Sequence, residues 1–282
     1  TVSEGPAAGH EVLSNPTSAR IARVAGLSRR NARAKHRRFL VEGPQGVREA
    51  VRHAPGRVLD VYLTEAVLER HSEIWDEAVA AGLYVHVTTQ QVMDAMSPDA
   101  QGLLAVVATE EATGSEALAA ALEGARLVAV LTQAQDPGNA GTIIRAADAA
   151  GADAVVLVRG SVDPTAPKVV RSTAGSLFHL PVVTGVALDD AVTALHNAGL
   201  TVLAADGRGD FDLFEAESLL EAPSAWLLGN EAHGLPSEAL SRADAVVSIP
   251  IYGKAESLNV AAAAAVCLYA SARAQAQNSG RS

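Results

Sequence analysis

Three polar side chains suited to ligand binding stand close together late in the chain. Residues 249–259 have the sequence Ile-Pro-Ile-Tyr-Gly-Lys-Ala-Glu-Ser-Leu-Asn, between an apolar run and an alanine-rich run. These runs predict a buried strand before the segment and a helix after it. Glu256, Ser257 and Asn259 then bring a carboxylate, a hydroxyl and an amide to a helix N-terminus, where backbone N–H groups lack partners. This spacing indicates a binding loop, although for Ser257 alone an ordinary helix cap is the better explanation.

Arg145 is a second residue whose setting suggests chemistry. It lies in an Ala- and Ile-rich run over 142–150, for which we expect a helix. A guanidinium near the buried side of such a helix is costly unless it faces a cleft or an ionic partner. Asp148, three residues further on, is the candidate partner of a structural arginine. The spacing alone therefore leaves a structural and a functional role open.

Two further segments join an apolar run to a Gly-rich loop. Residues 135–151 follow the apolar run 127–131, and residues 229–235 follow the apolar run 225–228. The first loop lacks the G-x-G-x-x-G spacing of a dinucleotide site, and the chain contains neither G-K-[ST] nor G-x-S-x-G. These absences disfavour a dehydrogenase, a P-loop enzyme and a serine hydrolase. A pocket of main-chain donors and carbonyls, suited to a small adenosine-type ligand, remains.

Taken together, the three loops carry a specific set of motifs. They are Asn-Ala-Gly-x-x-x-Arg over 139–145, Gly-Asn-Glu-x-x-Gly over 229–234 and Ile-Pro-Ile…Glu-Ser-Leu-Asn over 249–259. In this order they resemble the motifs of the SpoU (TrmH-like) branch of the SPOUT RNA methyltransferases, over the chain from about residue 126 onward. The resemblance implies a trefoil-knot domain, S-adenosylmethionine as cofactor, and methyl transfer to a ribose 2′-hydroxyl of RNA.

The same resemblance implies which residues form the site. The residues that match the family's catalytic positions are Arg145, Asn139, Glu231, Ser257 and Asn259. Those that match its cofactor contacts, with their neighbours, are Gly229, Ile249, Leu258, Leu228, Asn230, Ile251 and Gly207. In the family this arginine binds the target phosphate. Because arginine stays protonated in proteins, we expect Arg145 to orient the substrate and stabilise a forming alkoxide rather than to act as a base.

Some of these residues also have a purely structural explanation. Ile249 and Leu258 fit plain core packing as well as contact with an adenine ring. Glu231 fits an exposed turn beside Gly234. For Gly229, we expect that the missing side chain lets the backbone approach the ligand closely.

Bulk composition excludes several classes of protein. With 282 residues, 49% of them apolar, the chain can form two domains with a core in each. No apolar run approaches the roughly 20 residues of a membrane helix, and no signal-peptide pattern is present. The single cysteine, Cys267, excludes an internal disulfide and is expected to be a buried thiol, while the scattered histidines exclude a Cys/His zinc site. We therefore expect a cytoplasmic protein with no metal and no membrane partner.

Positive charge is concentrated in one part of an otherwise acidic chain. The net charge is −10, yet eleven of the 22 Lys and Arg residues lie between Arg20 and Arg57. A local basic field attracts phosphates whatever the net charge of the whole chain. Taken alone, such a run is more often a solvated helix face; ahead of an RNA-modifying domain we interpret it as an RNA contact. The candidate RNA-binding residues are Arg30, Arg33, Lys35, Arg37 and Arg38, with Lys168 and Arg171 from the second domain.

Strand and helix patterns alternate along the chain, which predicts two α/β domains, the second with a mostly parallel sheet. We expect disorder over 1–12, an RNA substrate-binding domain over 13–108, a linker over 109–125, the methyltransferase domain over 126–275 and a tail over 276–282. The pattern Phe-Leu-Val-Glu-Gly from residue 39 and Gln-Gly-Leu-Leu-Ala-Val from residue 101 resembles the ribosomal-protein-like RNA-binding domain of many SpoU enzymes.

Individual elements follow from hydrophobic periodicity and cap residues. Strands are expected at 39–43, 58–63, 84–87, 103–107, 126–131, 154–158, 180–183, 201–205, 225–228 and 245–249. Helices are expected at 15–28, 44–53, 65–81, 142–150, 189–198, 236–242 and 260–270, the first of them capped by Ser14, Asn15 or Thr17. The last helix is apolar all round, which favours burial on more than one side and hence the homodimer that the resemblance implies.

The leading hypothesis is an S-adenosylmethionine-dependent 2′-O-ribose methyltransferase acting on rRNA. A tRNA substrate, a resistance methyltransferase of the same fold and a noncatalytic RNA-binding protein are the alternatives. The matching catalytic residues argue against the noncatalytic protein, and a nucleotide-dependent dehydrogenase is the weakest hypothesis because its fingerprint is missing.

Overall fold

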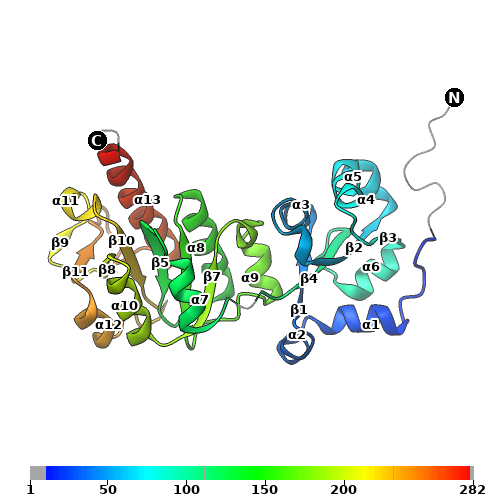
Figure 1. The fold of residues 1–282 in the computed structure, drawn as a ribbon, viewed down its shortest axis with the longest axis horizontal. Helices are drawn as coiled ribbons and strands as arrows, with labels where there is room; N and C mark the ends of the chain where they lie inside the picture. Colours follow the sequence, from blue (N-terminus) through cyan, green and yellow to red (C-terminus); the bar gives the residue numbers. More distant parts are fainter. Residues whose placement is uncertain (1–10, 111, 231, 280–282) are drawn as a thin grey trace. The chain divides into compact units, whose positions relative to one another are not determined.

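A computed structural model describes residues 11–110, 112–230 and 232–279 (Figure 1). The chain forms two compact units. The first comprises Thr1–Glu110 and Thr165–Phe178, and the second comprises Glu111–Pro164 and His179–Ser282. The chain therefore passes between the units more than once. The expectation of disorder over residues 1–12 falls mostly outside the described residues.

The first unit is built on a four-stranded sheet with the order β1-β4-β2-β3. Its central strand β4 is antiparallel to β1 and β2, whereas β2 and β3 are parallel. The strands are β1 (Arg38–Glu42), β2 (Val58–Thr64), β3 (Val85–Thr88) and β4 (Leu103–Ala108). These bounds lie within about two residues of the four strands expected from the sequence.

Helices cover both faces of this sheet, because apolar residues occupy successive positions of its strands. Phe39 and Val41 face one core, which α3 (Pro44–His53), α4 (Glu65–Arg70) and α5 (Ser72–Ala80) complete. Leu40 faces a second core, formed with α1 and α6. The remaining helices of this part are α1 (Ala19–Gly26), α2 (Arg30–His36) and α6 (Gln90–Met96).

Several details of this unit differ from the sequence-based expectation, among them helix α2, which was not predicted. The single helix expected over 65–81 is interrupted at His71, whose backbone leaves the helical region, so α4 and α5 are separate. Helix α1 begins later than expected, because Ser18 rather than an earlier residue accepts a hydrogen bond from the Ile21 N–H. Helix α6 was not predicted, although Thr89 caps it in the usual way through the Val92 N–H.

A segment from the second half of the sequence completes the first unit. It contains α9 (Pro167–Ser172) and a short 3₁₀ helix, η2 (Ser176–Phe178). Val170 enters the core, and the Phe178 ring stacks on Phe39 at 6.4 Å between centroids. The sequence range expected for the second domain includes this segment, but its packing partners belong to the first unit.

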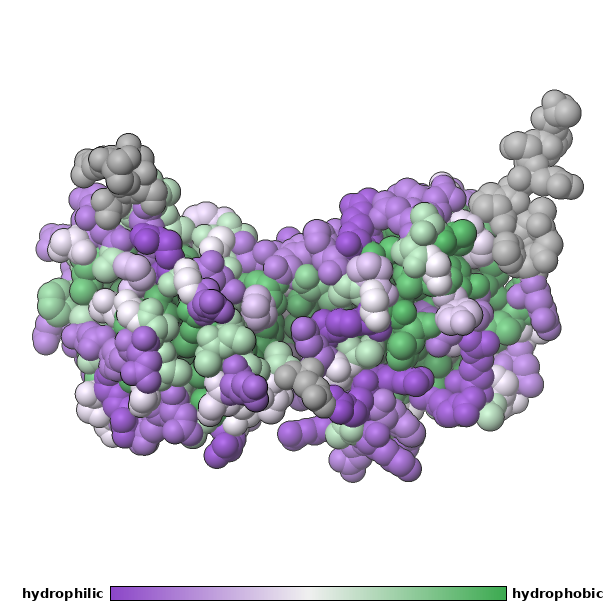
Figure 2. Space-filling view, in the orientation of Figure 1, coloured by the Kyte–Doolittle hydropathy of each residue, from purple (hydrophilic) through white to green (hydrophobic). Residues whose placement is uncertain are grey.

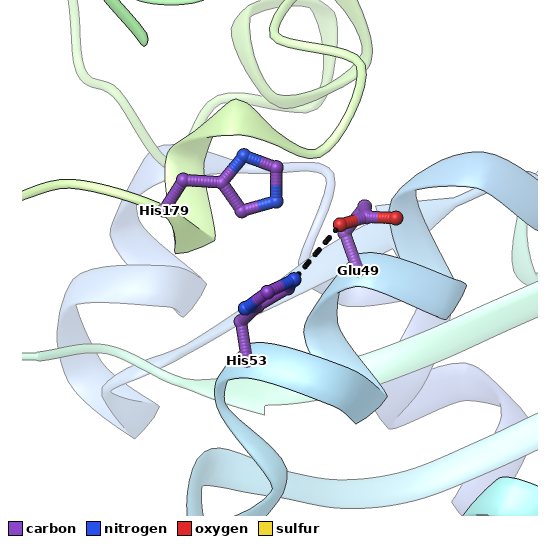
Figure 3. Close-up of side chains that lie close together, drawn as sticks. All are labelled: Glu49, His53 and His179. Carbon is purple, nitrogen blue, oxygen red and sulfur yellow. Dashed lines mark ion pairs between the residues drawn. The ribbon is translucent and has the colours of Figure 1, made fainter. Parts of the chain in front are cut away.

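Helix α3 lies against this segment. Gly175 has a backbone φ of +93°, and a Cβ at this position would overlap the Glu49 side chain. Glu49 also forms an ion pair with His53, one turn further along α3, at 3.2 Å between Oε2 and Nε2 (Figure 3). Only glycine therefore permits both this backbone turn and this close approach.

The second unit is built on a seven-stranded sheet with the order β7-β6-β5-β10-β8-β11-β9. Every strand pair in it is parallel. The strands are β5 (Leu127–Leu131), β6 (Ala154–Val158), β7 (Val182–Val186), β8 (Thr201–Ala205), β9 (Phe211–Asp212), β10 (Ser224–Leu228) and β11 (Ala245–Ser248). The prediction of a mostly parallel α/β sheet is confirmed.

Helices cover both faces of this sheet as well (Figure 1). Residues of α7 (Gly114–Ala121), α10 (Leu188–Asn197) and α12 (Ser237–Arg242) form the core on one face. On the other face, α13 (Val260–Ser279) packs against α8 (Pro137–Ala149) and the central strands. The short helix α11 (Glu217–Leu220) also contacts α13.

Helix α13 is longer than the run expected over 260–270, and it includes the first residues of the expected tail. Its buried side contains Cys267 and Leu268, and Ser271 accepts a hydrogen bond from the indole N–H of buried Trp226. The predicted buried thiol is confirmed, and burial raises the pKa of Cys267 to about 12. On the other side of the helix, Tyr269 is 53% exposed.

Candidate functional site

Four loops of the second unit lie at one edge of its sheet. Strands β5, β10, β8 and β11 are neighbours and run parallel, so their carboxyl ends point the same way. The second and third motifs lie in the loops that leave β10 and β11, and the loop that leaves β8 begins at Asp206. The first motif lies in the first turns of α8, directly after the loop that leaves β5. In open parallel sheets this edge is where ligands bind.

The first motif begins α8. The Asp136 carboxylate caps the helix by accepting a hydrogen bond from the Asn139 N–H at 2.7 Å, so α8 begins at Pro137, earlier than the expected start at Thr142. Ala140, Gly141, Ile143 and Ile144 are buried along one side of this helix.

Arg145 lies on the opposite, exposed side of α8. It forms no hydrogen bond or ion pair with the residues that the structure describes. The Asp148 carboxylate instead lies 2.7 Å from Nδ1 of His179. The guanidinium is exposed, so the expected cost of burying it does not arise. Arg145 and Asp148 do not form the structural ion pair that the sequence left open, because Asp148 is paired with His179.

Two asparagines connect the motifs to one another. Asn259 Nδ2 donates to Asn139 Oδ1 at 3.1 Å, which joins the third motif to the first. Asn230 Nδ2 donates to the Gln133 carbonyl at 2.9 Å, which joins the second motif to the loop before α8. Segments about a hundred residues apart in sequence are thus held together at the sheet edge.

The second motif forms a tight turn after β10. The backbones of Asn230 and Gly234 exchange two hydrogen bonds, and Asn230 Oδ1 accepts from the N–H groups of Ala232 and His233. A Cβ on Gly229 would lie 2.5 Å from the Gly234 carbonyl carbon. The protein's own backbone therefore requires a glycine at 229. Glu231 lies outside the described residues.

The third motif is an open loop. Residues 251–259 are exposed, among them Ser257 and Leu258, whereas Ile249 is half-buried. Between Ile249 and Leu258 the backbone forms no hydrogen bond with the described parts of the chain. Leu258 is 41% exposed and Ile251 38%, so core packing does not account for either side chain.

The helix cap at this loop belongs to Asn259. Its Oδ1 accepts hydrogen bonds from the Ala261 and Ala262 N–H groups at 2.8 and 3.3 Å. The capping role that sequence reasoning considered for Ser257 is therefore filled by another residue. Asn259 uses both ends of its amide, because its oxygen caps α13 while its nitrogen reaches Asn139.

The loop after β8 adds an acidic residue to the same edge. Asp206 accepts hydrogen bonds from the backbone and guanidinium of Arg208, and this partner lowers the pKa of the carboxyl group. Around Gly207, space is open. The sequence already indicated Asp206, together with Gly207, as a possible cofactor contact, but it did not indicate Gln133. The only signal of Gln133 is a position shortly after an apolar run, which many loop residues share.

The basic candidates of the first unit fall into two groups. Arg30, Lys35, Arg37 and Arg38 are exposed on and just after α2, where Figure 2 shows a gathering of hydrophilic side chains. Arg33 is only 5% exposed.

The guanidinium of Arg33 is used inside the first unit. It donates to the carbonyls of Leu27 and Ser28 at 3.1 and 2.8 Å, and to the Thr165 hydroxyl at 3.3 Å. Arg33 thus has a structural role, which corrects its expected place among the RNA contacts.

The two basic candidates on α9 also differ from each other. Lys168 is exposed, whereas Arg171 forms ion pairs with the buried Glu42 and with Asp99. Both belong to the first unit, and Arg171 is used at least partly to neutralise Glu42.

These features define a class of protein. A parallel α/β sheet with open, glycine-containing loops at its carboxyl edge is a ligand-binding α/β domain, and it is joined to a second α/β unit with exposed cations. No helix in the described parts of the chain has the length and apolarity needed to cross a membrane.

Comparison with known proteins specifies the family. Residues 126–269 match the model of the SpoU rRNA methylase family, and the chain belongs to this family. It is 34% identical over 248 residues to the 23S rRNA (guanosine(2553)-2′-O)-methyltransferase RlmP of Bacillus subtilis, covering 86% of this chain and 92% of that one. It is also 34% identical over 261 residues to the 23S rRNA (uridine(2479)-2′-O)-methyltransferase of Streptomyces viridochromogenes, covering 88% and 86%.

A solved structure agrees with this assignment. The SpoU methyltransferase AviRb from Streptomyces viridochromogenes, in complex with the cofactor AdoMet, matches with a TM-score of 0.78 and 30% identity. The match covers 92% of this chain and all of that one, so it includes the first unit as well as the second. The predicted family is confirmed.

Proposed function

We propose that the protein is an S-adenosylmethionine-dependent RNA 2′-O-ribose methyltransferase that acts on rRNA. Membership of the SpoU rRNA methylase family and relatives named as 23S rRNA 2′-O-methyltransferases support this function. The observation that carries it is the meeting of the three motifs at one sheet edge through Asn139, Asn230 and Asn259.

The loops of the second unit suit this cofactor. The backbone groups of 249–258 are available for hydrogen bonds, and the exposed side chains of Ile251 and Leu258 offer apolar surface for an adenine ring. We assign the cofactor contacts to this loop and to Gly229, Ile249, Leu228 and Gly207. Asn230 acts indirectly, because both ends of its amide are used to shape the loop. When bound, the cofactor supplies an electrophilic methyl group.

Arg145 has the property that an RNA-contacting group requires. Its guanidinium is exposed and charged, and it forms no ion pair with the described residues, so it is available to an RNA phosphate. In this position it orients the ribose and stabilises negative charge that develops on the 2′-oxygen. Orientation alone accounts for a large part of a methyl-transfer rate when the attacking atom and the methyl group are in line.

The other proposed catalytic residues support this arrangement. Asn139 and Asn259 hold the first and third motifs in register through their hydrogen bond. Ser257 is exposed and does not cap α13, so its hydroxyl is available to contact the ribose that carries the nucleophilic 2′-hydroxyl. Glu231 completes the set by its place in the second motif.

RNA docking is assigned chiefly to the first unit. Arg30, Lys35, Arg37 and Arg38 present exposed positive charge on and after α2, and Lys168 adds another. Because this surface is assigned to phosphates, it supplies affinity rather than sequence discrimination. We further propose that the first unit is the ribosomal-protein-like docking domain of the family and that the second contains the trefoil knot.

A cytoplasmic homodimer is the proposed working form. Helix α13 presents Tyr269 to solvent, and Phe214 from the neighbouring loop is 57% exposed. Aromatic side chains on one surface are typical of protein interfaces.

One experiment tests the proposed function. Calorimetric titration of the full chain with S-adenosylmethionine, with NADH as the control, is followed by transfer of labelled methyl to total rRNA and tRNA. We expect cofactor binding, no NADH binding, and label in rRNA. Label in tRNA alone would show that the substrate is tRNA rather than rRNA. A folded protein that binds no S-adenosylmethionine would instead indicate a noncatalytic RNA-binding protein.

A further inference from the structure

A pocket of about 590 Å³ lies in the first unit, apart from the motif loops. Residues of α1, of the end of α2 and of strands β1, β2 and β4 line it. Its size falls within the range of small-molecule sites, which is roughly 300–1,000 Å³. None of its lining residues belongs to the motif loops, and Arg38 is the one lining residue among the RNA-binding candidates described above.

The lining of this pocket is divided by chemistry. Val24, Leu27, Tyr62 and Val106 are buried and form an apolar floor. The rim is formed by basic side chains, those of Arg20, Arg23, His36 and Arg38. An apolar floor beneath a basic rim matches a ligand with a flat apolar part and an anionic part.

The single acidic residue of the lining does not cancel the charge of the rim. Asp60 accepts a hydrogen bond from Arg20 at 3.0 Å, and its carboxylate lies 2.8 Å from His86. Arg20 also donates to the Tyr62 hydroxyl at 3.0 Å, so this arginine is held in place.

The remaining arginines of the rim are available to a ligand. Arg23 and Arg38 are exposed and form no ion pair with the described residues. The pocket therefore retains an excess of positive charge that favours an anion.

We propose that this pocket holds one unpaired nucleotide of the RNA substrate. The base lies over the apolar floor, and Arg23 and Arg38 bind the adjoining phosphates. Bases in a duplex are stacked and paired, whereas the unstacked bases of loops and bulges enter protein pockets. The cofactor itself is a poor candidate, since its sulfonium makes it cationic. This inference rests on the proposed function, because it names the part of the RNA that the first unit recognises.

The test compares single-stranded RNA with duplex RNA. Affinities of the full chain for a short single strand and for the duplex of the same sequence are measured across a range of salt concentrations. The variant is Arg23→Ala with Arg38→Ala. The charge-matched control is Arg52→Ala with Arg70→Ala, two exposed arginines of the same unit that do not line the pocket.

We expect the pocket variant to bind the single strand about tenfold or more weakly, and to reduce the salt slope by about 1.4, as expected for two lost phosphate contacts. Duplex affinity falls less, and the control variant binds both RNAs like the parent. Equal losses for single strand and duplex would overturn the inference, since a general basic surface would explain them. Lack of single-strand binding by the parent would overturn it too.

A second measurement needs no substitution. A single strand containing 4-thiouridine is cross-linked to the unaltered protein, and the adducts are mapped by mass spectrometry. We expect adducts on peptides containing His36 or Tyr62, and adducts confined to other peptides contradict the pocket assignment. Methyl transfer to rRNA, assayed separately, reports on the proposed function, so a failure of that function is distinguishable from a failure of this inference.

Discussion

The two units of the molecule differ in how they use charge. The first contains 14 Lys and Arg residues against 13 Asp and Glu, and the second contains 8 against 19. In the first unit the cations cluster on and beside α2, whereas in the second they are scattered among carboxylates. The proposed RNA-binding surface and the proposed methyl-transfer site therefore lie in different units of the chain. The acidic second unit has few cations, and two of them, Arg145 and Lys254, lie within the motif segments.

The different uses of arginine within the first unit show that a charged residue cannot be assigned a role from its type alone. Arg33 and Arg30 stand three residues apart in the same helix, yet Arg33 is buried against backbone carbonyls and Arg30 is exposed. Arg57 is also used internally: it donates to the Ala108 carbonyl, and burial lowers its pKa. The predictions below test whether the two units divide binding and chemistry as described.

The largest effect is expected from Arg145→Ala. Loss of the one motif guanidinium should lower the methyl-transfer rate by about 10²- to 10³-fold, the usual result of removing a group that stabilises developing negative charge. S-adenosylmethionine affinity, measured by calorimetry, should stay within about twofold of the parent. Arg159→Ala, an exposed arginine of the same unit outside the motifs, is the control. An equal loss of cofactor affinity would place Arg145 in the cofactor site instead.

Neutralising the exposed cations of α2 should weaken binding rather than chemistry. In the variant with Arg30, Lys35, Arg37 and Arg38 changed to Ala, RNA affinity should fall by on the order of 10²-fold, and the salt slope should flatten by roughly three to four. At saturating RNA the turnover number should remain near that of the parent. A salt slope equal to the parent's would show that this cluster is only a solvated helix face.

The comparison within α2 predicts a difference in stability. Arg33→Ala removes the donor for two carbonyls, so the free energy of unfolding should fall by about 2 kcal/mol. Arg30→Ala, at an exposed position, should change it by less than about 0.5 kcal/mol. Urea unfolding followed by fluorescence measures both, since buried Trp75 reports on the first unit. Equal stability of the two variants would mean that Arg33 is not needed for the fold.

The smallest effect concerns Asp206 in the acidic unit. Arg208 lowers the pKa of Asp206 below its ordinary 3.8, so the pair stabilises the folded state above this pH. This stabilisation disappears as the pH falls through the lower folded pKa. Asp206→Asn should therefore reduce the free energy of unfolding by about 0.5 kcal/mol at pH 7, and the difference should vanish in strong acid. Urea unfolding of the parent and of Asp206→Asn, at pH 7 and in strong acid, measures this difference. A difference in the free energy of unfolding that persists in strong acid would not come from the Asp206–Arg208 pair.

Local patterns in the sequence predicted most elements and the location of the site. The apolar runs gave the central strands of both sheets within one or two residues, because a buried strand is recognisable from a few neighbouring side chains. The motif spacing correctly marked loops at the carboxyl edge of a parallel sheet. Patterns of this kind are weaker for short elements such as α6, β9 and α11, which contain too few residues to show a period.

Contacts between distant segments could not be predicted in this way. No local feature of residues 165–178 indicates that Val170 and Phe178 pack with the first unit, because the partners lie more than a hundred residues away. For the same reason the sequence did not reveal that Asn259, rather than Ser257, caps α13 while binding Asn139.

The sequence by itself determined the motif set, the buried thiol of Cys267, the order of the elements and the concentration of cations near α2. Each of these depends on residue type and short spacing. The tertiary structure alone decided which cations are exposed, which glycine makes room for backbone, and which asparagines join the motifs. These features depend on the packing of segments distant in sequence, and side-chain burial and hydrogen-bond geometry exist only once those segments have met.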